Sequence, residues 1–372
     1  MNSYESLATP GVQGLQPYQP GKPESALKRE SGLDTIIKLA SNENPLGPDP
    51  LICSRLPALL AELGRYPDGT GFELKQLLAD RLSVKPEQIT LGNGSNDILE
   101  LVARVFLQPG REAVMSRHAF AIYQLATQAV GADYVLASPT DGVNGPVYGH
   151  DLQAIRELVN DKTALVFIAN PNNPTGTYLS SFWLKDFIDS LPQQTICVLD
   201  EAYFEYVKAS DYSTALDWLD ECPNLMVTRT FSKAYGMAGL RIGYSVSSID
   251  VAELLNRVRQ PFNVNSLALA AAQLALLDDA HLNAGISLNT KGLLQLAEGL
   301  EALGLAVIPS VGNFISCNLA RSVQPVYQAL LNRGVIVRPI ENYDMPGYIR
   351  TTVGTTSEID YFLNALELTL RA

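Results

Sequence analysis

Residues 225–236 read LMVTRTFSKAYG, an apolar run followed by a polar loop that contains Lys233. Short apolar runs bounded by polar loops are typical of strands that are buried on both faces of a parallel sheet. Similar runs occur at Leu165–Ile168 and Ile196–Leu199, and a stretch with helical spacing, Phe182–Leu191, lies between them. The pattern predicts an α/β domain of three layers, with a mostly parallel sheet between two layers of helices.

The same criteria predict further elements on either side of this stretch. Strands are expected at Ile89–Leu91, Ala113–Met115, Tyr134–Leu136, Ile242–Tyr244, Ala306–Ile308, Phe314–Ser316, Val335–Val337 and Tyr348–Arg350. Helices are expected at Ile98–Leu107, Val251–Val258, Leu267–Leu277 and Val323–Leu331, and in the last segment from Ile359 to Leu370.

Composition and pattern divide the chain into three parts. Residues 1–50 are rich in proline and glycine, which predicts an extended arm rather than a packed element. Apolar side chains in this arm indicate that it docks onto other parts of the protein. Residues 51–262 contain the alternating strands and helices of a large domain, and residues 263–372 change to the mixed order of a smaller α+β domain.

The charge and the cysteines exclude several classes of function. The sequence has 27 Lys plus Arg against 39 Asp plus Glu, and this acidic balance argues against a nucleic-acid partner. No apolar stretch is long enough to span a membrane, and the first residues contain no signal-peptide pattern. Four cysteines without CxxC spacing and three histidines argue against a metal site and fit a reducing cytoplasm.

Ligands of open α/β sheets bind at the carboxyl ends of the strands, so the residues after each strand are candidates for a site. Residues 92–97, Gly-Asn-Gly-Ser-Asn-Asp, open a helix after the first expected strand. Free N–H groups and the helix dipole would make such a turn an anion site, although an ordinary glycine-rich turn has the same sequence.

Three further loops carry chemistry. Residues 169–176 form a string with two prolines around two asparagines, in which an Asn side chain can donate to an oxyanion. Asp200 ends a buried strand, where a carboxylate needs either a cationic partner or a role as a helix cap. Lys233 follows another buried strand, and desolvation there would favour its neutral form, whereas most loop lysines are solvated charges. Ser232 and Arg241 could then hold a phosphate.

The order of these motifs resembles the fold type I pyridoxal-phosphate aminotransferases of class II. More closely, the chain is similar to the histidinol-phosphate aminotransferases. The supporting strings are residues 39–47 (LASNENPLG), 65–68 (RYPD), 92–95 (GNGS) and 337–339 (VRP). The resemblance extends from Tyr18 to Arg350.

The resemblance implies a catalytic set and a cofactor, pyridoxal 5′-phosphate. Lys233 would hold the cofactor covalently and move a proton at the substrate Cα. Asp200 would pair with the pyridine nitrogen and keep it protonated, and Tyr203 would assist at the phenolate oxygen. The implied cofactor-binding residues are Gly94, Ser95, Asn96, Phe120, Asn173, Asp200, Tyr203, Thr230, Ser232, Lys233 and Arg241, with Tyr66 from a second subunit.

The role of Tyr66 implies a homodimer with shared sites, in which the arm also packs on the partner. For substrate, the resemblance implies that Arg350 binds the anionic group of histidinol phosphate and of glutamate in turn. The remaining implied substrate-binding residues are Tyr18, Asn42, Asn173 and Arg338. The expected reaction converts histidinol phosphate and 2-oxoglutarate to imidazole acetol phosphate and glutamate in histidine biosynthesis.

Two alternatives stay open at this point. The same scaffold serves aromatic amino-acid aminotransferases, and decarboxylases of threonine phosphate share these motifs. The segment Ser116–Phe120 reads Ser-Arg-His-Ala-Phe where many relatives have a Pro-Thr pair before the ring that stacks on the cofactor. This departure lies beside the expected substrate position and therefore concerns specificity.

Overall fold

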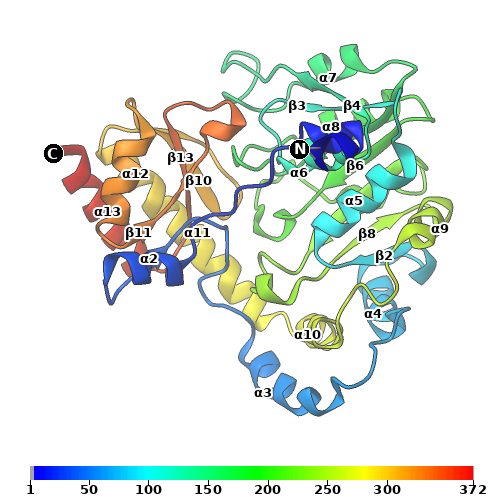
Figure 1. Cartoon of the computed structure of the whole chain (residues 1–372), viewed down its shortest axis with the longest axis horizontal. Helices are drawn as coiled ribbons and strands as arrows, with labels where there is room; N and C mark the ends of the chain where they lie inside the picture. Colours follow the sequence, from blue (N-terminus) through cyan, green and yellow to red (C-terminus); the bar gives the residue numbers. More distant parts are fainter. Residues whose placement is uncertain (1–3, 372) are drawn as a thin grey trace.

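Seven strands form the central sheet of the larger domain in the computed structural model, which describes residues 4–371 (Figure 1). Their order across the sheet is β2 (Ile89–Gly92), β8 (Gly243–Ser247), β7 (Leu225–Thr230), β6 (Ile196–Asp200), β5 (Thr163–Ala169), β3 (Glu112–Ser116) and β4 (Asp133–Ala137). Residues 1–3, the beginning of the segment in which no signal peptide is expected, lie outside the described residues.

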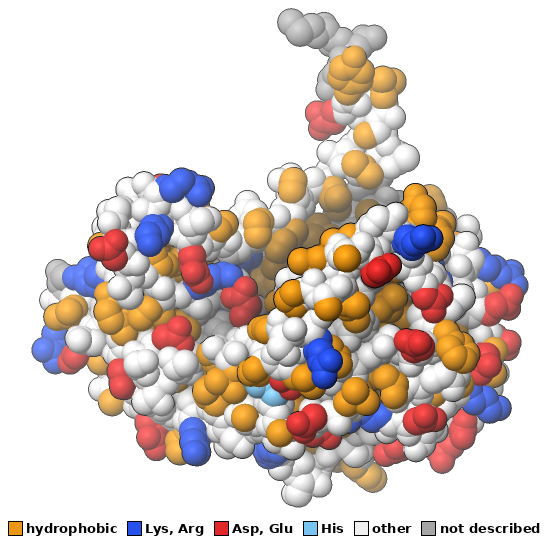
Figure 2. All heavy atoms as spheres, turned by 90° about the horizontal axis from the view of Figure 1, so that it is seen from below, with side chains coloured by type: hydrophobic (Ala, Val, Ile, Leu, Met, Phe, Trp, Pro, Cys, Tyr) orange, Lys and Arg blue, Asp and Glu red, His pale blue; other side chains and the backbone are white. Residues whose placement is uncertain are grey.

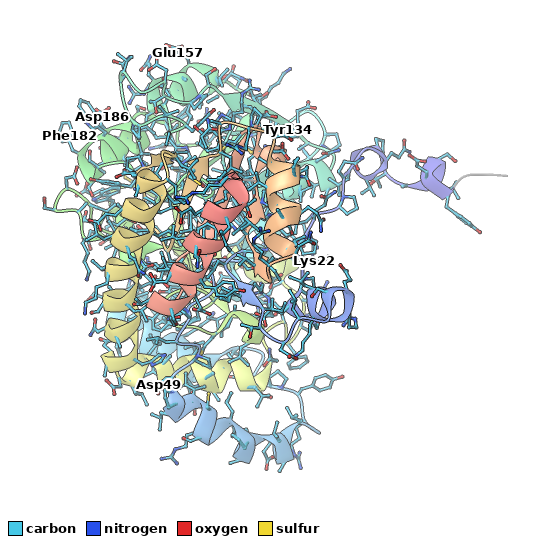
Figure 3. The ribbon with its side chains drawn as sticks, turned by 90° about the vertical axis from the view of Figure 1, so that its left-hand side faces the viewer. Lys22, Asp49, Tyr134, Glu157, Phe182 and Asp186 are labelled. Atoms are coloured by element: carbon cyan, nitrogen blue, oxygen red, sulfur yellow. The ribbon has the colours of Figure 1, made fainter. Side chains whose placement is uncertain are left out.

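The sheet is mostly parallel, as predicted, with one exception. Strand β8 is antiparallel to both of its neighbours, β7 and β2. The chain returns from β7 to β8 through residues 231–242 without a crossover α-helix, and a connection of this kind produces an antiparallel pair. The prediction that residues 134–136 form a buried strand is wrong in part, because β4 is the edge strand and Tyr134 is 38% exposed (Figure 3).

Helices cover both faces of this sheet. Alternate sheet residues such as Leu165 and Phe167 pack against one set of helices, and Val166 and Ile168 pack against the other. The first set is α5 (Ser95–Phe106), α6 (Ile122–Ala129) and α9 (Ile249–Val258), and the second is α3 (Pro50–Leu59), α4 (Phe72–Leu82), α7 (Leu152–Leu158), α8 (Ser181–Ser190) and α10 (Ser266–Leu277). The three-layer prediction is confirmed.

The smaller domain contains two sheets and three long helices, in agreement with the α+β prediction. A four-stranded sheet has the order β12 (Arg338–Pro339), β13 (Tyr348–Thr352), β10 (Phe314–Asn318) and β9 (Ala306–Ile308), and β1 (Ile37–Lys38) pairs with β11 (Val335–Ile336). The helices α11 (Ala280–Ala302), α12 (Val323–Leu331) and α13 (Thr356–Arg371) lie side by side in Figure 3.

Helix α11 was not predicted, although it is the longest helix among the described residues. Glycine has a low helix propensity, and the helix contains three glycines at intervals of seven residues, Gly285, Gly292 and Gly299. The sequence of this segment therefore did not indicate a helix. A Cβ atom on Gly292 would lie 2.5 Å from a methyl group of Val353. Glycine therefore allows α11 to approach the rest of the small domain closely.

The N-terminal arm is more ordered than an extended segment. Helix α2 (Glu24–Ser31) buries Leu27 against the small domain, and β1 pairs in parallel with β11. The first described residues, with η1 (Tyr4–Leu7), project from the body of the molecule (Figure 2), whereas α1 (Pro10–Gln13) packs against the C-terminal end of α6. The other 3₁₀ turns are η2 (Leu60–Glu62), η3 (Pro86–Gln88), η4 (Phe204–Tyr206), η5 (Ala215–Trp218), η6 (Ala238–Leu240) and η7 (Glu341–Tyr343).

Candidate active site

A cavity of about 200 Å³ lies at the carboxyl ends of β5, β6 and β7 and is bordered by β12 and β13 of the small domain. Figure 2 shows the molecule hollowed between its two lobes. Fourteen of the residues expected at the site line this cavity: Tyr18, Asn42, Ser95, Asn96, Phe120, Asn173, Asp200, Tyr203, Thr230, Ser232, Lys233, Arg241, Arg338 and Arg350. The structure thus brings together residues that are up to 332 positions apart in sequence, from Tyr18 to Arg350.

Asp200 is the last residue of β6 and its side chain is 5% exposed. Its Oδ2 accepts a hydrogen bond of 2.9 Å from the hydroxyl of Tyr123, and its Oδ1 accepts one of 3.2 Å from the N–H of Ala202. Burial raises the pKa of Asp200, and the bond from Tyr123 opposes this rise. Within residues 4–371 the carboxylate has no ion-pair partner, so the site could accept a cationic group of a ligand.

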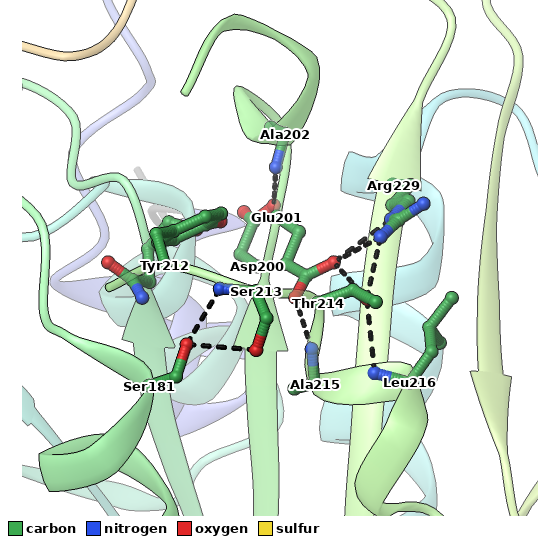
Figure 4. A network of polar contacts seen from close by, with 11 residues as sticks. Ser181, Asp200, Glu201, Ala202, Tyr212, Ser213, Thr214, Ala215, Leu216 and Arg229 are labelled. Atoms are coloured by element: carbon green, nitrogen blue, oxygen red, sulfur yellow. Dashed lines mark hydrogen bonds and ion pairs between the residues drawn. The ribbon is translucent and has the colours of Figure 1, made fainter. Parts of the chain in front are cut away.

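The side chain of the next residue, Glu201, does not line the cavity and instead contacts Arg229 and Ala215 (Figure 4). Its Oε2 accepts bonds of 3.0 and 2.7 Å from the Nε and Nη2 of Arg229, and its Oε1 accepts one from the N–H of Ala215. The guanidinium carbon of Arg229 lies 3.9 Å from the ring centre of Phe204. This network fixes the turn after β6, and so supports the position of Asp200.

Lys233 lies in the loop after β7, where its Nζ donates a hydrogen bond of 3.2 Å to the carbonyl oxygen of Ser41. Desolvation lowers the pKa of Lys233 to about 8, and the positive charge of Arg350 contributes in the same direction. The neutral amine that nucleophilic chemistry requires is therefore well populated near pH 8.

The start of α5 and Arg241 lie together at one end of the cavity and could hold an anion. Helix α5 begins at Ser95, and the first N–H groups of a helix have no partner within the helix. The Nη1 of Arg241 donates to the hydroxyl oxygen of Ser232 at 3.3 Å. Gly94 has a φ of 81°, and a Cβ atom there would lie 2.4 Å from Nη2 of Arg241. Glycine at this position therefore leaves room for Arg241 beside the helix terminus.

Tyr203 and Asn173 face the cavity from loops that follow neighbouring strands. The hydroxyl of Tyr203 accepts a hydrogen bond of 2.8 Å from Nδ2 of Asn42, and burial raises the pKa of Tyr203. Oδ1 of Asn173 accepts a hydrogen bond from Nη1 of Arg350. These contacts link the large domain to the arm and to the small domain.

Arg338 and Arg350 lie directly opposite each other on the paired strands β12 and β13. Arg350 is 7% exposed and donates from Nη2 to the carbonyl oxygen of Ala40 at 2.9 Å. Its buried Nε has no hydrogen-bond partner within residues 4–371. Arg338 donates to the carbonyl oxygen of Gln19 and lies over the ring of Tyr18. Two guanidinium groups at one wall make this part of the cavity suited to an anion.

Two predicted aromatic residues have different positions. Phe120 lies in the loop after β3 and lines the cavity, with its ring edge-on to Tyr123 at 5.9 Å. Tyr66 does not line the cavity of its own chain; it is 82% exposed and stacks on Phe262 at 4.7 Å. A role for Tyr66 at the site would therefore require a second copy of the chain.

Sequence reasoning missed Tyr123, which contacts Asp200 directly. It lies in an amphipathic helix, where an aromatic residue is normally part of the core, so the sequence contained no signal for its role. Within the described residues, the structure contains no group of three or more potential metal ligands. No helix of that same part of the chain is long and apolar enough to cross a membrane.

A lysine and a buried aspartate at the strand ends of a mostly parallel sheet, facing arginines of a second domain, form the arrangement of a fold type I aminotransferase. A model of the aminotransferase class I and II family matches residues 34–366, and the chain belongs to this family.

Individual relatives cover almost the whole chain. Histidinol-phosphate aminotransferase 2 of Methylococcus capsulatus is 55% identical over 99% of both chains, and that of Pseudomonas aeruginosa is 55% identical over 98% of both. Among solved structures, histidinol-phosphate aminotransferase from Sinorhizobium meliloti, in complex with pyridoxal-5′-phosphate, has a TM-score of 0.88 at 28% identity and covers 98% of this chain and 97% of its own.

Proposed function

We propose that the protein is a pyridoxal-phosphate enzyme that transfers an amino group between histidinol phosphate and 2-oxoglutarate. The observation that carries the proposal is the presence of Lys233 and Arg350 in one cavity, the first with its pKa lowered to about 8 and the second with an unpartnered Nε. Relatives that are 55% identical and named histidinol-phosphate aminotransferase favour this reaction over an aromatic amino-acid aminotransferase or a threonine-phosphate decarboxylase.

The residues of the cavity fit pyridoxal phosphate. Asp200 would hold the protonated ring nitrogen, since its carboxylate is buried with neutral partners. The start of α5, Ser232 and Arg241 would hold the phosphate, and Phe120 would cover one face of the ring. When bound, the cofactor supplies an electron-accepting ring.

Lys233 and Tyr203 would act next to the reacting atoms. Nζ of Lys233 would hold the cofactor and later carry the proton that leaves the substrate Cα. Burial keeps this amine partly neutral at pH 8, so that it can accept the proton. Tyr203 would remain protonated, because burial raises its pKa, and could donate to the cofactor phenolate.

Arg350 would bind the anionic end of each substrate in turn. Both of its Nη atoms already donate to Asn173 and to Ala40, which fixes the plane of the guanidinium group. Its free Nε and the nearby Arg338 remain for a phosphate or a carboxylate. One rigid cationic wall would thus serve histidinol phosphate and glutamate.

We also infer a homodimer. Large apolar side chains are exposed on the surface around Tyr66, including Leu60 (54%), Leu63 (52%), Phe72 (63%) and Phe262 (45%). Apolar surface of this kind is typical of an interface. Tyr66 would then reach the phosphate site of the partner.

Mixing two variants, each of which lacks one residue of the proposed shared site and is expected to be inactive alone, tests this site. In a hybrid of Lys233→Ala and Tyr66→Ala subunits, one site combines the intact Lys233 of one chain with the intact Tyr66 of the other. After equal mixing and subunit exchange, about a quarter of the sites are intact if subunits pair at random. Recovery of about that share of wild-type activity supports the dimer, and no recovery in a mixture shown to form hybrids contradicts it.

We place the enzyme in the cytoplasm. All four cysteines, Cys53, Cys197, Cys222 and Cys317, are unpaired, which suits a reducing compartment. Cell fractionation with an antibody against the chain would test this location.

Single-turnover half-reactions test the proposed substrate. The cofactor spectrum of the purified enzyme is followed as histidinol phosphate, phenylalanine or phosphothreonine is added. Fast conversion to the pyridoxamine form with histidinol phosphate alone is the expected result. Comparable conversion with phenylalanine would indicate the aromatic enzyme, and release of carbon dioxide from phosphothreonine would indicate a decarboxylase.

A further inference from the structure

His118 lies in the loop between β3 and α6 that also carries Phe120. Its side chain is 3% exposed, and its Nδ1 lies 2.6 Å from the carbonyl oxygen of Tyr343 in the small domain. A carbonyl oxygen only accepts hydrogen bonds, so Nδ1 carries the proton. Burial lowers the pKa of His118, which favours the neutral ring with its hydrogen on Nδ1.

Tyr343 is held by the same loop at a second point. Its side chain packs in an apolar cluster against Ala121, and the backbone N–H of Ala121 opposes the rise that burial causes in the pKa of Tyr343. The two contacts, from His118 and Ala121, therefore flank Phe120 on both sides in the sequence. Tyr343 ends the turn η7, which lies between the strands that carry Arg338 and Arg350. Its phenol interacts electrostatically with both arginines.

His118 also connects to the opposite wall of the site. Its carbonyl oxygen accepts a hydrogen bond of 2.8 Å from Nδ2 of Asn172, the neighbour of Asn173. Its ring packs edge-on against Tyr148 with a centroid distance of 4.7 Å. The ion pair between Arg117 and Asp344 joins the same segments, but at 3.6 Å and with both side chains exposed it contributes little. The buried hydrogen bond from His118 to Tyr343 is therefore the stronger of these two polar contacts between the loop of Phe120 and the turn η7.

We propose that His118 is a positioning residue for substrate binding, because its bond to Tyr343 fixes the loop of Phe120 relative to the arginines of the small domain. Phe120 and Arg350 border the same cavity from different domains, so their separation limits the length of the substrate between them. This inference deepens the proposed function and rests on it for the identity of the substrate.

The effect should fall on binding more than on chemistry. Lys233 and Asp200 have no hydrogen bond to His118, and their partners, Ser41 and Tyr123, would be unchanged by its loss. Loss of the N–H of His118 leaves the buried carbonyl oxygen of Tyr343 without a hydrogen-bond partner. We therefore expect the turn η7 to shift from its position. The arginines that follow and precede this turn would then be less well placed for an anion.

Two substitutions separate the hydrogen bond from packing. His118→Phe keeps an aromatic ring against Tyr148 but removes the donor, whereas His118→Asn retains an N–H group at a similar distance from the backbone. The expected result for His118→Phe is a KM for histidinol phosphate and for glutamate raised on the order of tenfold, with kcat within about threefold. His118→Asn should restore most of the loss. Arg117→Gln, which removes only the exposed ion pair, serves as the matched control.

Hydrogen–deuterium exchange provides a readout without turnover. In the cofactor-free protein, His118→Phe should exchange faster than wild type in residues 340–348, and His118→Asn should not. Tyr343→Phe is an independent variant, expected to raise KM because the polar interactions of the Tyr343 hydroxyl with Ala121 and the two arginines are lost. Unchanged KM and exchange in both His118→Phe and Tyr343→Phe, or an Asn variant as impaired as the Phe variant, would overturn the proposal. If wild type fails to convert histidinol phosphate, the proposed function fails, while the exchange comparison still tests His118.

Discussion

The hydroxyl of Tyr123 donates a hydrogen bond of 2.9 Å to Oδ2 of Asp200, and both side chains are buried. The ring of Tyr123 stacks on Phe167 at 4.8 Å with an interplanar angle of 6°. Because this stacking fixes the ring of Tyr123, its hydroxyl holds the carboxylate of Asp200 in one orientation. A hydrogen bond to the charged form also lowers the pKa of a carboxyl group, which here opposes the effect of burial.

Tyr123→Phe keeps the aromatic stack and removes this bond. The pKa of Asp200 should then rise, so the ionised carboxylate is lost at a higher pH as the solution is acidified. We expect turnover to fall about tenfold and the acid limb of the kcat profile to move to higher pH. Asp200→Ala should retain some cofactor and lose far more rate. An unchanged acid limb in Tyr123→Phe would contradict the role of the hydroxyl.

The lowered pKa of Lys233 predicts how the cofactor-free protein captures pyridoxal phosphate. Capture requires the neutral amine, so its rate should increase about tenfold per pH unit at low pH and level off near pH 8, the approximate pKa of Lys233. A lysine with the ordinary value of 10.5 would give a rate that still increases above pH 9. Stopped-flow absorbance at each pH distinguishes the two curves.

Lys233→Ala should abolish the covalent attachment and essentially all turnover. The visible absorption of the reconstituted enzyme should change, because the cofactor is no longer bonded to the protein. Lys208→Ala is a suitable control, since Lys208 is exposed. A visible spectrum identical to wild type in the Lys233 variant would refute the assignment of this lysine.

The sequence predicted the sheet well because its strands are buried on both faces and are therefore continuous apolar runs. Strands β5 and β6 were found within two residues at each end. The direction of β8 was not predicted, because it depends on the absence of a helix in the loop from Phe231 to Ile242. Helix α11 was missed because its glycines are explained only by close packing against residues such as Val353, which are distant in sequence.

The candidate site was predicted from sequence where its residues lie at the end of a strand or in the loop directly after it. Asp200 ends a buried strand and Lys233 follows one, so local sequence marked both as candidates, and the resemblance to the aminotransferases then gave each its expected role. Tyr123, His118 and Tyr343 were missed as functional residues, because their roles depend on contacts with parts of the chain that are at least 77 residues away. Such contacts are determined by packing and leave no local pattern.

Arg350→Gln tests the anion site. The substitution removes the charge and keeps a polar group near Asn173, so the architecture should persist. Loss of a buried charged partner costs about 3 kcal/mol, which corresponds to a decrease in kcat/KM on the order of a hundredfold for histidinol phosphate and for glutamate. Arg321→Gln, at an exposed position outside the cavity, should leave both values unchanged. A loss confined to one of the two substrates would contradict a shared anion site.

The ion pair between Arg229 and Glu201 should contribute mainly to stability. Both side chains are buried, and Arg229→Met would leave the carboxylate of Glu201 without its cation. Removing one partner of a buried pair costs about 3 kcal/mol or more, so the free energy of unfolding in urea should fall by that amount. Arg257→Met removes an exposed ion pair with Glu253 and should change the free energy of unfolding by less than about 1 kcal/mol. Equal effects of the two substitutions would show that the buried network does not hold the turn after β6.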